Sequence, residues 1–573
     1  MRWQLSPLLP PVPRLPLHRH LHFDGHPPQR GIAPMSTPTE TTTHQSHLVR
    51  NALWVGASFA LAAGMGLLRN MLIAREFGLG AELDAYYAAF KLPDLLFTVI
   101  AGGALTTAFI PVFVQLLSTE GITSAWRLAS ALTNLVVLAA VALAVPTALL
   151  SPWLVRTIIA PGFTAPLQDE TAILMRLVLL STVIFGVSSV QTGALHGFKH
   201  FWLPALAPVV YPVGTILGAL WLVPLWGIRG LAVGTVIGAC MHLLVKIPAL
   251  LHYQFRWWPV LDVHAAAVQR VAILFGPRVL DLGVFHLTML ATTNLASRLS
   301  AGSVSALEWG WDAMQIPETV IGTAFGLVAL PTLADMATRG DLQGLRDTLA
   351  GALRLVLALA LPAACALIVL GQPLLRLLYQ RGAFDGAATE AVYIALRFYA
   401  LGLVAHVCLE LVTRAFFARH DTVTPLLAAT GSAAFNILLG ILLMTPLGHG
   451  GLALANSLAV SGEVAVLVLI LRRRIGSIRG RQLLDTLARL TLATVLMAMT
   501  MLVVYRAIGE ADTTTPMIVA SVATVGLLSY LICATLLKVN PLQLARDLAH
   551  SGAVPHRGAI RETEPSQRGV TRR

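Results

Sequence analysis

Charged residues are scarce in this chain: Asp, Glu, Lys and Arg together make up 12% of its 573 residues. Soluble domains carry about 25% charged residues, so this composition excludes a soluble globular protein of the same length. Cysteine is scarce too, with only four residues, Cys240, Cys365, Cys408 and Cys533. None of them has the spacing of a metal site, and we interpret all four as packing residues.

Motifs for nucleotides and metals are also missing from the sequence. There is no Walker A loop, no GxGxxG after a strand and no metal-ligand spacing of His and Cys. We therefore predict no enzyme activity, no cofactor and no metal, and we exclude a pump driven by ATP bound to this chain. The formal net charge of +12 suggests nucleic acid as a partner. Lys and Arg gather in alternate loops instead, which is typical of a membrane protein and predicts no nucleic-acid partner.

Apolar residues dominate what remains. They make up 56% of the sequence, and the mean hydropathy is +0.74. We count about fourteen apolar runs long enough to cross a bilayer, and they centre near residues 62, 102, 139, 184, 214, 240, 285, 318, 360, 402, 435, 461, 497 and 526. Runs of this length satisfy their backbone groups in lipid only as helices, so the sequence predicts an all-α integral membrane protein with about 14 transmembrane helices.

The sequence repeats itself at an offset of 221 residues. The stretch 152–163 (PWLVRTIIAPGF) matches 373–384 (PLLRLLYQRGAF), and 230–232 matches 451–453. Two similar halves with an even number of spans enter the membrane from the same side, so we predict two parallel six-helix lobes that rock against each other. The lobes are expected over 50–255 and 256–475, and two additional helices over 476–538. Duplication without transport, as in a scaffold, is the alternative.

The two ends of the chain are polar. We predict that 1–49 is disordered, with Met35 as an alternative start, and that 539–573 is a basic tail facing anionic lipid. The loops on one side hold most of the Lys and Arg residues, above all the run 472–489. This bias places both termini in the cytoplasm.

Charges inside apolar spans are costly in lipid and usually functional. In the first lobe they are Arg69, Asp84, Lys91 and Asp94, and in the second they are Arg278, Asp281, Glu308, Asp312 and Glu318. Asp84, Lys91 and Asp94 fall close to one helix face, which predicts a charged cavity wall or a cluster of ion pairs. Arg278 and Asp281 can neutralise each other. Glu308 and Asp312 are like charges four residues apart and need a facing cation.

Four segments of the sequence are distinctive: AFKLPDLL…GGALTTAFIPVF (89–113), GSVSALEW…IP…G…ALPTLA (302–334), LYQRGAFD (378–385) and RAFFARHDTVTP (414–425). They resemble the MurJ/MviN family of lipid II flippases, within the multidrug/oligosaccharidyl-lipid/polysaccharide exporter superfamily. The resemblance extends from 50 to about 540. It implies that Arg69 and Asp84 match functional positions of the family. Cavity arginines of the family fall at Ala63, Phe97, Thr98 and Asp312, and an ion-binding position falls near Thr292.

These observations predict a flippase for a polyprenyl-diphosphate-linked glycan, the peptidoglycan precursor above all, in the bacterial inner membrane. Arg69, Asp84, Lys91, Asp94 and Arg278 are the predicted substrate-binding residues, and Asp281, Glu308, Asp312 and Glu318 the predicted coupling or gating residues. Membrane potential or a cation gradient would drive transport, and envelope-synthesis proteins are expected partners. The resemblance implies that the last two helices hold the lipid tail. The alternatives are a cation-coupled exporter of amphipathic molecules and a non-transporting scaffold.

Overall fold

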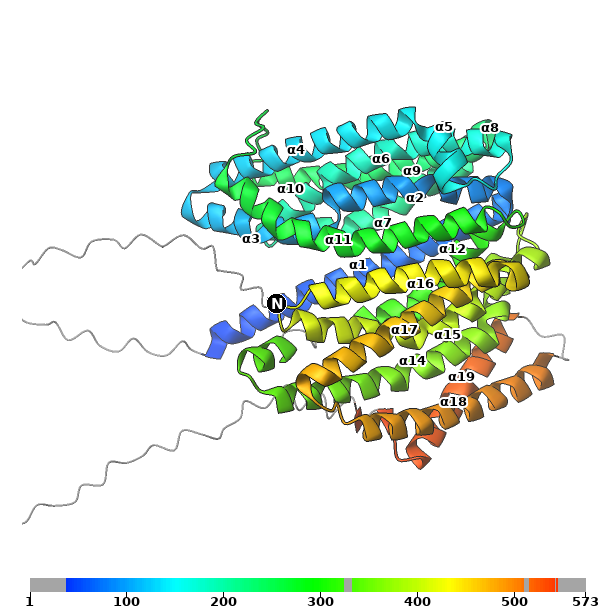
Figure 1. Cartoon of the computed structure of the whole chain (residues 1–573). Helices are drawn as coiled ribbons and strands as arrows, with labels where there is room; N and C mark the ends of the chain where they lie inside the picture. The colour runs from blue at the N-terminus through cyan, green and yellow to red at the C-terminus, as the bar shows by residue number, and fades with distance from the viewer. Residues whose placement is uncertain (1–37, 324–331, 510–514, 542, 545–573) are drawn as a thin grey trace, which may run out of the picture. The chain divides into compact units, whose positions relative to one another are not determined.

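The computed structural model describes residues 38–323, 332–509, 515–541, 543 and 544. Every regular element in these residues is helical (Figure 1). The first half contains α1 (Pro38–Phe77), α2 (Ala81–Ala101), α3 (Gly103–Thr119), α4 (Ile122–Leu149), α5 (Ser151–Leu154), the π-helix η1 (Val155–Ile159), α6 (Ala165–Gly197), α7 (Trp202–Leu217), η2 (Gly218–Leu222), α8 (Val223–Trp226), α9 (Ile228–Leu244) and α10 (Ile247–His252).

The second half contains α11 (Ala266–Ala296), α12 (Ser303–Glu318), the π-helix η3 (Thr319–Thr323), a short helix over 332–338, α14 (Leu342–Tyr379), α15 (Gly386–Phe417), α16 (Val423–Leu447), α17 (His449–Ile475), α18 (Gly480–Gly509) and α19 (Thr515–Leu536). The predicted all-α fold is therefore confirmed. Residues 38–49, predicted to be disordered, are helical here. The sequence Thr37-Pro38-Thr39-Glu40 is a helix-start signal, with a proline at the first position and a capping-box glutamate, that the prediction missed.

The 221-residue repeat reappears in the helix boundaries. α15, α16 and α17 begin 221 residues after α6, α7 and α9. Left-handed backbone recurs at the same offset, with φ of 59° at both Lys199 and His420. The two halves thus share the conformation of a turn between helices as well as the helices themselves. We call the half that ends with α10 lobe 1, and the half from α11 to α17 lobe 2.

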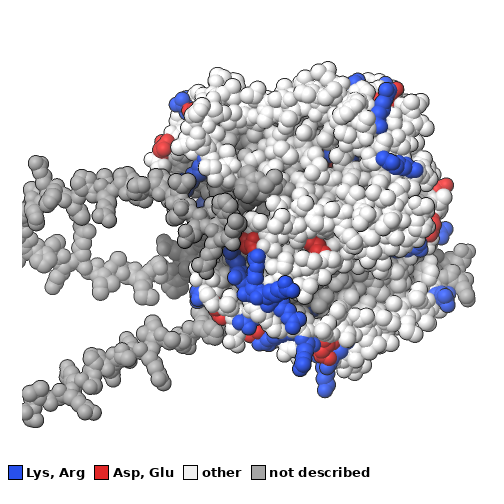
Figure 2. Space-filling model, in the orientation of Figure 1, with Lys and Arg blue, Asp and Glu red and all other residues white. Residues whose placement is uncertain are grey.

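Eleven of the described helical segments are long and apolar enough to span a membrane. They coincide with eleven of the predicted spans, so the count of 14 stays a prediction for the other three. Those three are centred near 62, 285 and 318. The first falls in α1, which carries Arg69, and the second in α11, which carries Arg278 and Asp281. The third falls in α12 and η3, and α12 carries Glu308 and Asp312. Charged side chains otherwise gather toward the helix ends, and the surface between is largely uncharged (Figure 2).

The second span of lobe 1 is interrupted, and in lobe 2 the corresponding helix changes into a π-helix. α2 ends at Ala101 and α3 begins at Gly103, while Gly102 takes an extended ψ of 171°. Pro93 and Pro111 lie inside α2 and α3. In lobe 2, Pro317 lies inside α12, which continues as η3. A Cβ at Gly102 would lie 2.9 Å from the Thr98 carbonyl oxygen, so the break in lobe 1 needs a residue without a side chain.

Small residues and a terminal helix pair complete the packing. A Cβ placed on Gly214 of α7 would lie 2.1 Å from the Gly238 nitrogen of α9, so this pair of helices is as close as its backbones allow. α18 and α19 both contact α14. Met497 and Met501 are buried there, and the Tyr530 hydroxyl donates to the Ala358 carbonyl at 2.5 Å.

We expect Gly214→Ala to lower the melting temperature of the purified protein, because the new methyl group overlaps the α9 backbone. Overpacking of this kind costs about 1–3 kcal/mol. Gly431→Ala in α16 is the matched control, since a Cβ there meets no atom within 4 Å. Intrinsic tryptophan fluorescence during heating in detergent measures both. Equal melting temperatures would contradict the close packing of α7 on α9.

Candidate functional site

The buried carboxylate of Asp84 joins the two lobes. Asp84 lies in the first turn of α2 and is 2% exposed. Its Oδ2 accepts the Gly302 backbone N–H at 2.6 Å, and its Oδ1 accepts the Ser305 N–H at 2.8 Å and the Ser305 hydroxyl at 2.6 Å. These groups open α12, so a carboxylate from lobe 1 caps a helix of lobe 2. The helix dipole and three hydrogen bonds compensate the buried charge.

Two further hydrogen bonds, each donated by a backbone N–H, flank this cap. In lobe 1, the Gly162 N–H donates to Ser297 Oγ of lobe 2 at 3.2 Å. In lobe 2, the Ala383 N–H donates to the Arg75 carbonyl of lobe 1 at 2.9 Å. Gly162 and Ala383 are 221 residues apart, so the repeat produces both contacts. We call these two contacts and the Asp84 cap the interlobe seal, and it lies at the end of the helices where α1 meets α2.

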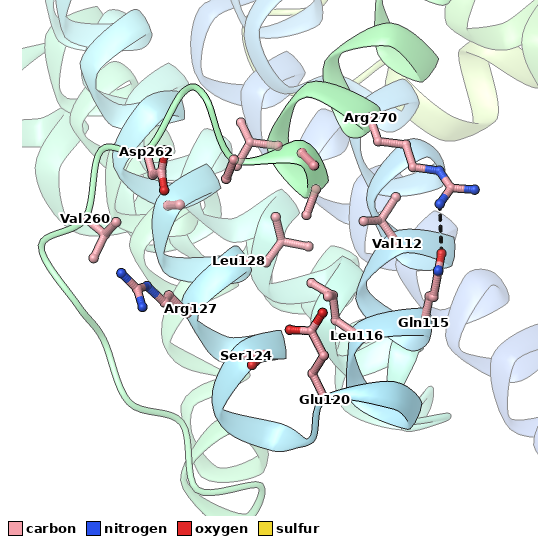
Figure 3. Close-up of a pocket in the computed structure, with 15 residues that line it drawn as sticks. Val112, Gln115, Leu116, Glu120, Ser124, Arg127, Leu128, Val260, Asp262 and Arg270 are labelled. Atoms are coloured by element: carbon pink, nitrogen blue, oxygen red, sulfur yellow. Dashed lines mark hydrogen bonds between the residues drawn. The ribbon is translucent and has the colours of Figure 1, made fainter. Parts of the chain in front are cut away.

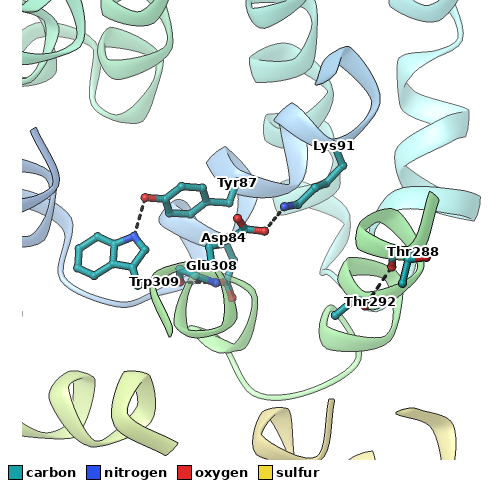
Figure 4. A network of polar contacts seen from close by, with 8 residues as sticks. Asp84, Tyr87, Lys91, Thr288, Thr292, Glu308 and Trp309 are labelled. Atoms are coloured by element: carbon teal, nitrogen blue, oxygen red, sulfur yellow. Dashed lines mark hydrogen bonds and ion pairs between the residues drawn. The ribbon is translucent and has the colours of Figure 1, made fainter. Parts of the chain in front are cut away.

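Further along α2, polar side chains cross between the lobes (Figure 4). Trp309 Nε1 of α12 donates to the Tyr87 hydroxyl at 2.5 Å. One turn later Lys91 forms an ion pair with Glu308 of α12, and both side chains are mostly buried. The facing cation that Glu308 and Asp312 need is thus supplied by the other lobe.

Arg69 of α1 lies beside this pair. Its Nε and Nη2 donate to Asn70 Oδ1 at 3.0 and 2.9 Å. Asp312 interacts electrostatically with both Arg69 and Lys91. Asp94 is exposed and has no hydrogen bond to another described side chain, although it interacts electrostatically with Lys91. The cluster of Arg69, Lys91, Asp94, Glu308 and Asp312 therefore brings cations and carboxylates from three helices together, and we call it the central charge cluster.

Among the remaining predicted site residues, one described side chain has its partner elsewhere. Glu318 interacts instead with Glu410 of α15, and Glu410 pairs with Arg414 at 2.9 Å. Arg278 and Asp281 belong to α11, but their side chains lie outside the described residues. The assignment of individual residues to substrate binding or gating stays a prediction.

Positions where the resemblance implies an arginine or an ion ligand make other contacts here. Phe97 packs on Phe185 of α6, with ring centroids 5.8 Å apart. Thr98 Oγ1 forms a hydrogen bond with His286 Nε2 of α11 at 2.9 Å. Thr292 donates to its own helix at the Thr288 carbonyl, and it lines a cavity of about 10 Å³ beside Glu308. A cavity of this size holds about one water molecule.

Comparison with known proteins now identifies the family. The pattern described as "Lipid II flippase MurJ" matches residues 73–511, well over half of the chain. The chain belongs to the lipid II flippase MurJ family. A MurJ of Burkholderia cenocepacia is 29% identical over 75% of this chain and 84% of its own length. A Rhizobium meliloti protein named for the same family is 30% identical over 79% of this chain and 85% of its own length.

Solved structures give the same fold. A MurJ described as being in an inward closed conformation aligns with a TM-score of 0.71 at 23% identity and covers 87% of this chain and 100% of its own. An inward-facing multidrug MATE family transporter aligns with a TM-score of 0.62 at 14% identity, over 73% of this chain and 95% of its own. The predicted family is therefore confirmed, and the chain is a multi-pass membrane protein that shares its fold with these MurJ and MATE structures.

The MurJ-like loop RAFFARHDTVTP proves to be a structural corner. Asp421 Oδ1 accepts the Thr424 N–H at 3.0 Å as α16 begins, and Asp421 also pairs with Arg474 of α17. Burial opposes ionisation of Asp421, but the hydrogen bonds from Thr424 and Arg474 outweigh it and lower its pKa to about 2. This motif therefore fixes the junction of α15, α16 and α17 and lies apart from the central charge cluster.

We expect Lys91 and Glu308 to be energetically coupled. Lys91→Ala leaves a mostly buried carboxylate without its cation, and Glu308→Ala leaves the cation alone, whereas the double variant removes both charges. A double-mutant cycle on thermal or denaturant unfolding should give a coupling free energy of about 0.5–3 kcal/mol. Arg156→Ala with Asp169→Ala, an exposed pair, serves as the control cycle and should give nearly none. Additive effects at Lys91 and Glu308 would contradict the interlobe ion pair.

Proposed function

We propose that this protein flips a polyprenyl-diphosphate-linked glycan, the peptidoglycan precursor lipid II, across the bacterial cytoplasmic membrane by alternating access. The observation that carries the proposal is the central charge cluster, which lies between two repeat-related lobes of a MurJ-family chain. A cation on each of α1 and α2 offers donors to a diphosphate, because guanidinium and ammonium groups bind phosphate oxygens strongly. Peptidoglycan synthesis, and through it cell shape, would depend on this transport.

The ion pair across the lobes suggests how cargo could trigger movement. Lys91 of lobe 1 is held by Glu308 of lobe 2. A diphosphate that binds Lys91 competes with Glu308 and weakens the link between α2 and α12. Binding of the anionic head group would then favour separation of the lobes. The population shifts because the head group binds the separated state more tightly than the closed state.

Energy for the cycle would come from membrane potential or a cation gradient. Moving one charge through a membrane potential changes its free energy by about 2.3 kcal/mol per 100 mV.

We propose that both termini face the cytoplasm, as the bias of Lys and Arg predicts. The terminal pair α18 and α19 presents exposed apolar side chains, among them Val495, Val503 and Leu528, that suit a lipid tail. We propose no enzymatic activity, and we propose envelope-synthesis proteins as partners.

Transport is tested in proteoliposomes that contain the purified protein and fluorescent lipid II, with an impermeant reagent that modifies only the outer-leaflet head group. We expect the protein to make the whole lipid II pool accessible, and Arg69→Ala to slow this at least tenfold, because a charge-assisted hydrogen bond contributes about 1.5–3 kcal/mol. Arg156→Ala, far from the cluster, should keep the normal rate.

The same vesicles distinguish the alternatives. Export of an amphipathic cation without any lipid II movement would favour the exporter, and transport of neither would favour the scaffold. The exporter is less well supported by the contacts, because Glu308 is neutralised by Lys91 and Asp312 lies beside Arg69 and Lys91. Carboxylates held in this way are less available to a transported cation.

A further inference from the structure

The segment that joins the two lobes is hydrogen-bonded to α4. It runs from the end of α10 to the start of α11 and has no regular structure. Asn134 Nδ2 donates to the carbonyls of Trp258 and Val260 at 2.8 and 2.9 Å, and Trp257 Nε1 donates to Asn134 Oδ1 at 2.9 Å. The Asn134 side chain thus forms hydrogen bonds with three residues of this segment. We call the segment the lobe linker (residues 253–265).

The lobe linker carries apolar side chains that point away from the protein. Trp257 and Leu261 are each 56% exposed, and Val263 is 48% exposed. α3 ends and α4 begins close to this segment, so it lies at the end of two membrane-spanning helices. Tryptophan and aliphatic side chains exposed at such an end are typical of the boundary between water and hydrocarbon. This part of the linker therefore faces the membrane surface.

Between the lobe linker, α3, α4 and the start of α11 lies a cavity of about 450 Å³ (Figure 3). Its inner wall is apolar, with Val112, Leu116 and Leu128. Charges of both signs surround its mouth, as carboxylates of Glu120 and Asp262 and guanidinium groups of Arg127 and Arg270. Arg270 Nη1 donates to Gln115 Oε1 at 2.9 Å. The other three charged side chains form no ion pair or hydrogen bond with a described residue.

We propose that this cavity binds the head group of an aminophospholipid. A primary ammonium group would bind the carboxylates of Glu120 and Asp262, the phosphate would bind Arg127, and the glycerol and first acyl carbons would cover the apolar wall. A purely anionic head group suits the site less, because the two carboxylates repel it. The volume lies within the range of small-ligand sites, about 300–1,000 Å³.

Such a lipid would touch both lobe 1 and the helix that enters lobe 2. α11 contacts α2 and α3 as well as α16, and its first turns bury Val268 and Val271 in the same apolar cluster as α4. A bound lipid therefore fixes the base of α11 against lobe 1. Membrane composition would in this way influence how easily the lobes rock, independently of which cargo is carried.

Native mass spectrometry of the full chain, released from nanodiscs with equal amounts of phosphatidylethanolamine, phosphatidylcholine and phosphatidylglycerol, tests the site. We expect phosphatidylethanolamine to be retained about tenfold more than the other two lipids, since one charge-assisted contact is worth about 1.4 kcal/mol or more. Glu120→Gln should remove most of this preference. Arg127→Gln should weaken retention of all three lipids, because each carries the phosphate.

Asp169→Asn, an exposed acidic residue at the start of α6, is the control and should keep the preference. Equal retention of the three lipids, stronger retention of phosphatidylglycerol, or a preference unchanged by Glu120→Gln would each overturn the proposal. Folding is checked by the melting temperature of every variant. Lipid retention is measured without transport, so failure here and failure of lipid II flipping are distinguishable.

Discussion

The fold depends on one carboxylate that crosses from the first lobe to the second. Asp84 is shielded from water and satisfies two backbone N–H groups and a hydroxyl at the start of α12. A helix end buried at an interface needs such a partner, because its first N–H groups have none within the helix. Asp84 and the start of α12 are thus complementary, and separating them leaves a charge and two donors uncompensated. The lobes are held most specifically at this point.

The internal duplication explains why the seal is where it is. Asp84 and Ser305 are 221 residues apart and therefore occupy the same place in the two halves. A repeat axis between the lobes brings equivalent positions face to face, and the same axis pairs the contacts of Gly162 and Ala383. The two halves then differ in chemistry at the shared position: lobe 1 supplies the carboxylate and lobe 2 supplies the donors. Duplication therefore placed equivalent positions of the two lobes in contact, and sequence divergence gave one lobe the acceptor and the other the donors.

Beyond the interlobe seal, the central charge cluster links the two lobes through an ion pair that an anionic ligand can disrupt. Lys91 and Glu308 lie within a few turns of Asp84, on the same two helices, but their contact is a simple ion pair that another anion can replace. The cluster is therefore suited to respond to an anionic head group, while the seal defines the state from which the response begins.

Periodicity and composition predicted the helices well, because apolar length and spacing alone decide what can cross a bilayer. The helices that hold the other three predicted spans, α1, α11 and α12, also carry the charged residues Arg69, Arg278, Asp281, Glu308 and Asp312. The partners of those charges could not be predicted from spacing: Glu308 meets Lys91 from 217 residues away, and Glu318 turns toward α15. The role of Ser305 was within reach, since the repeat offset points from Asp84 directly to it. The break at Gly102 was not predicted, although the adjacent glycines Gly102 and Gly103 are present in the sequence.

The central claim is that the Asp84 cap keeps the lobes together at the α1–α2 end. Spin labels at Ala165 and Ala387, exposed residues in the first turns of α6 and α15, report the separation of the lobes there by electron–electron double resonance. In Asp84→Ala we expect the distance distribution to broaden and shift to longer values, and in Asp485→Asn, an exposed residue of α18, to match the unchanged protein. A distribution in Asp84→Ala that is indistinguishable from that of the unchanged protein would contradict the account.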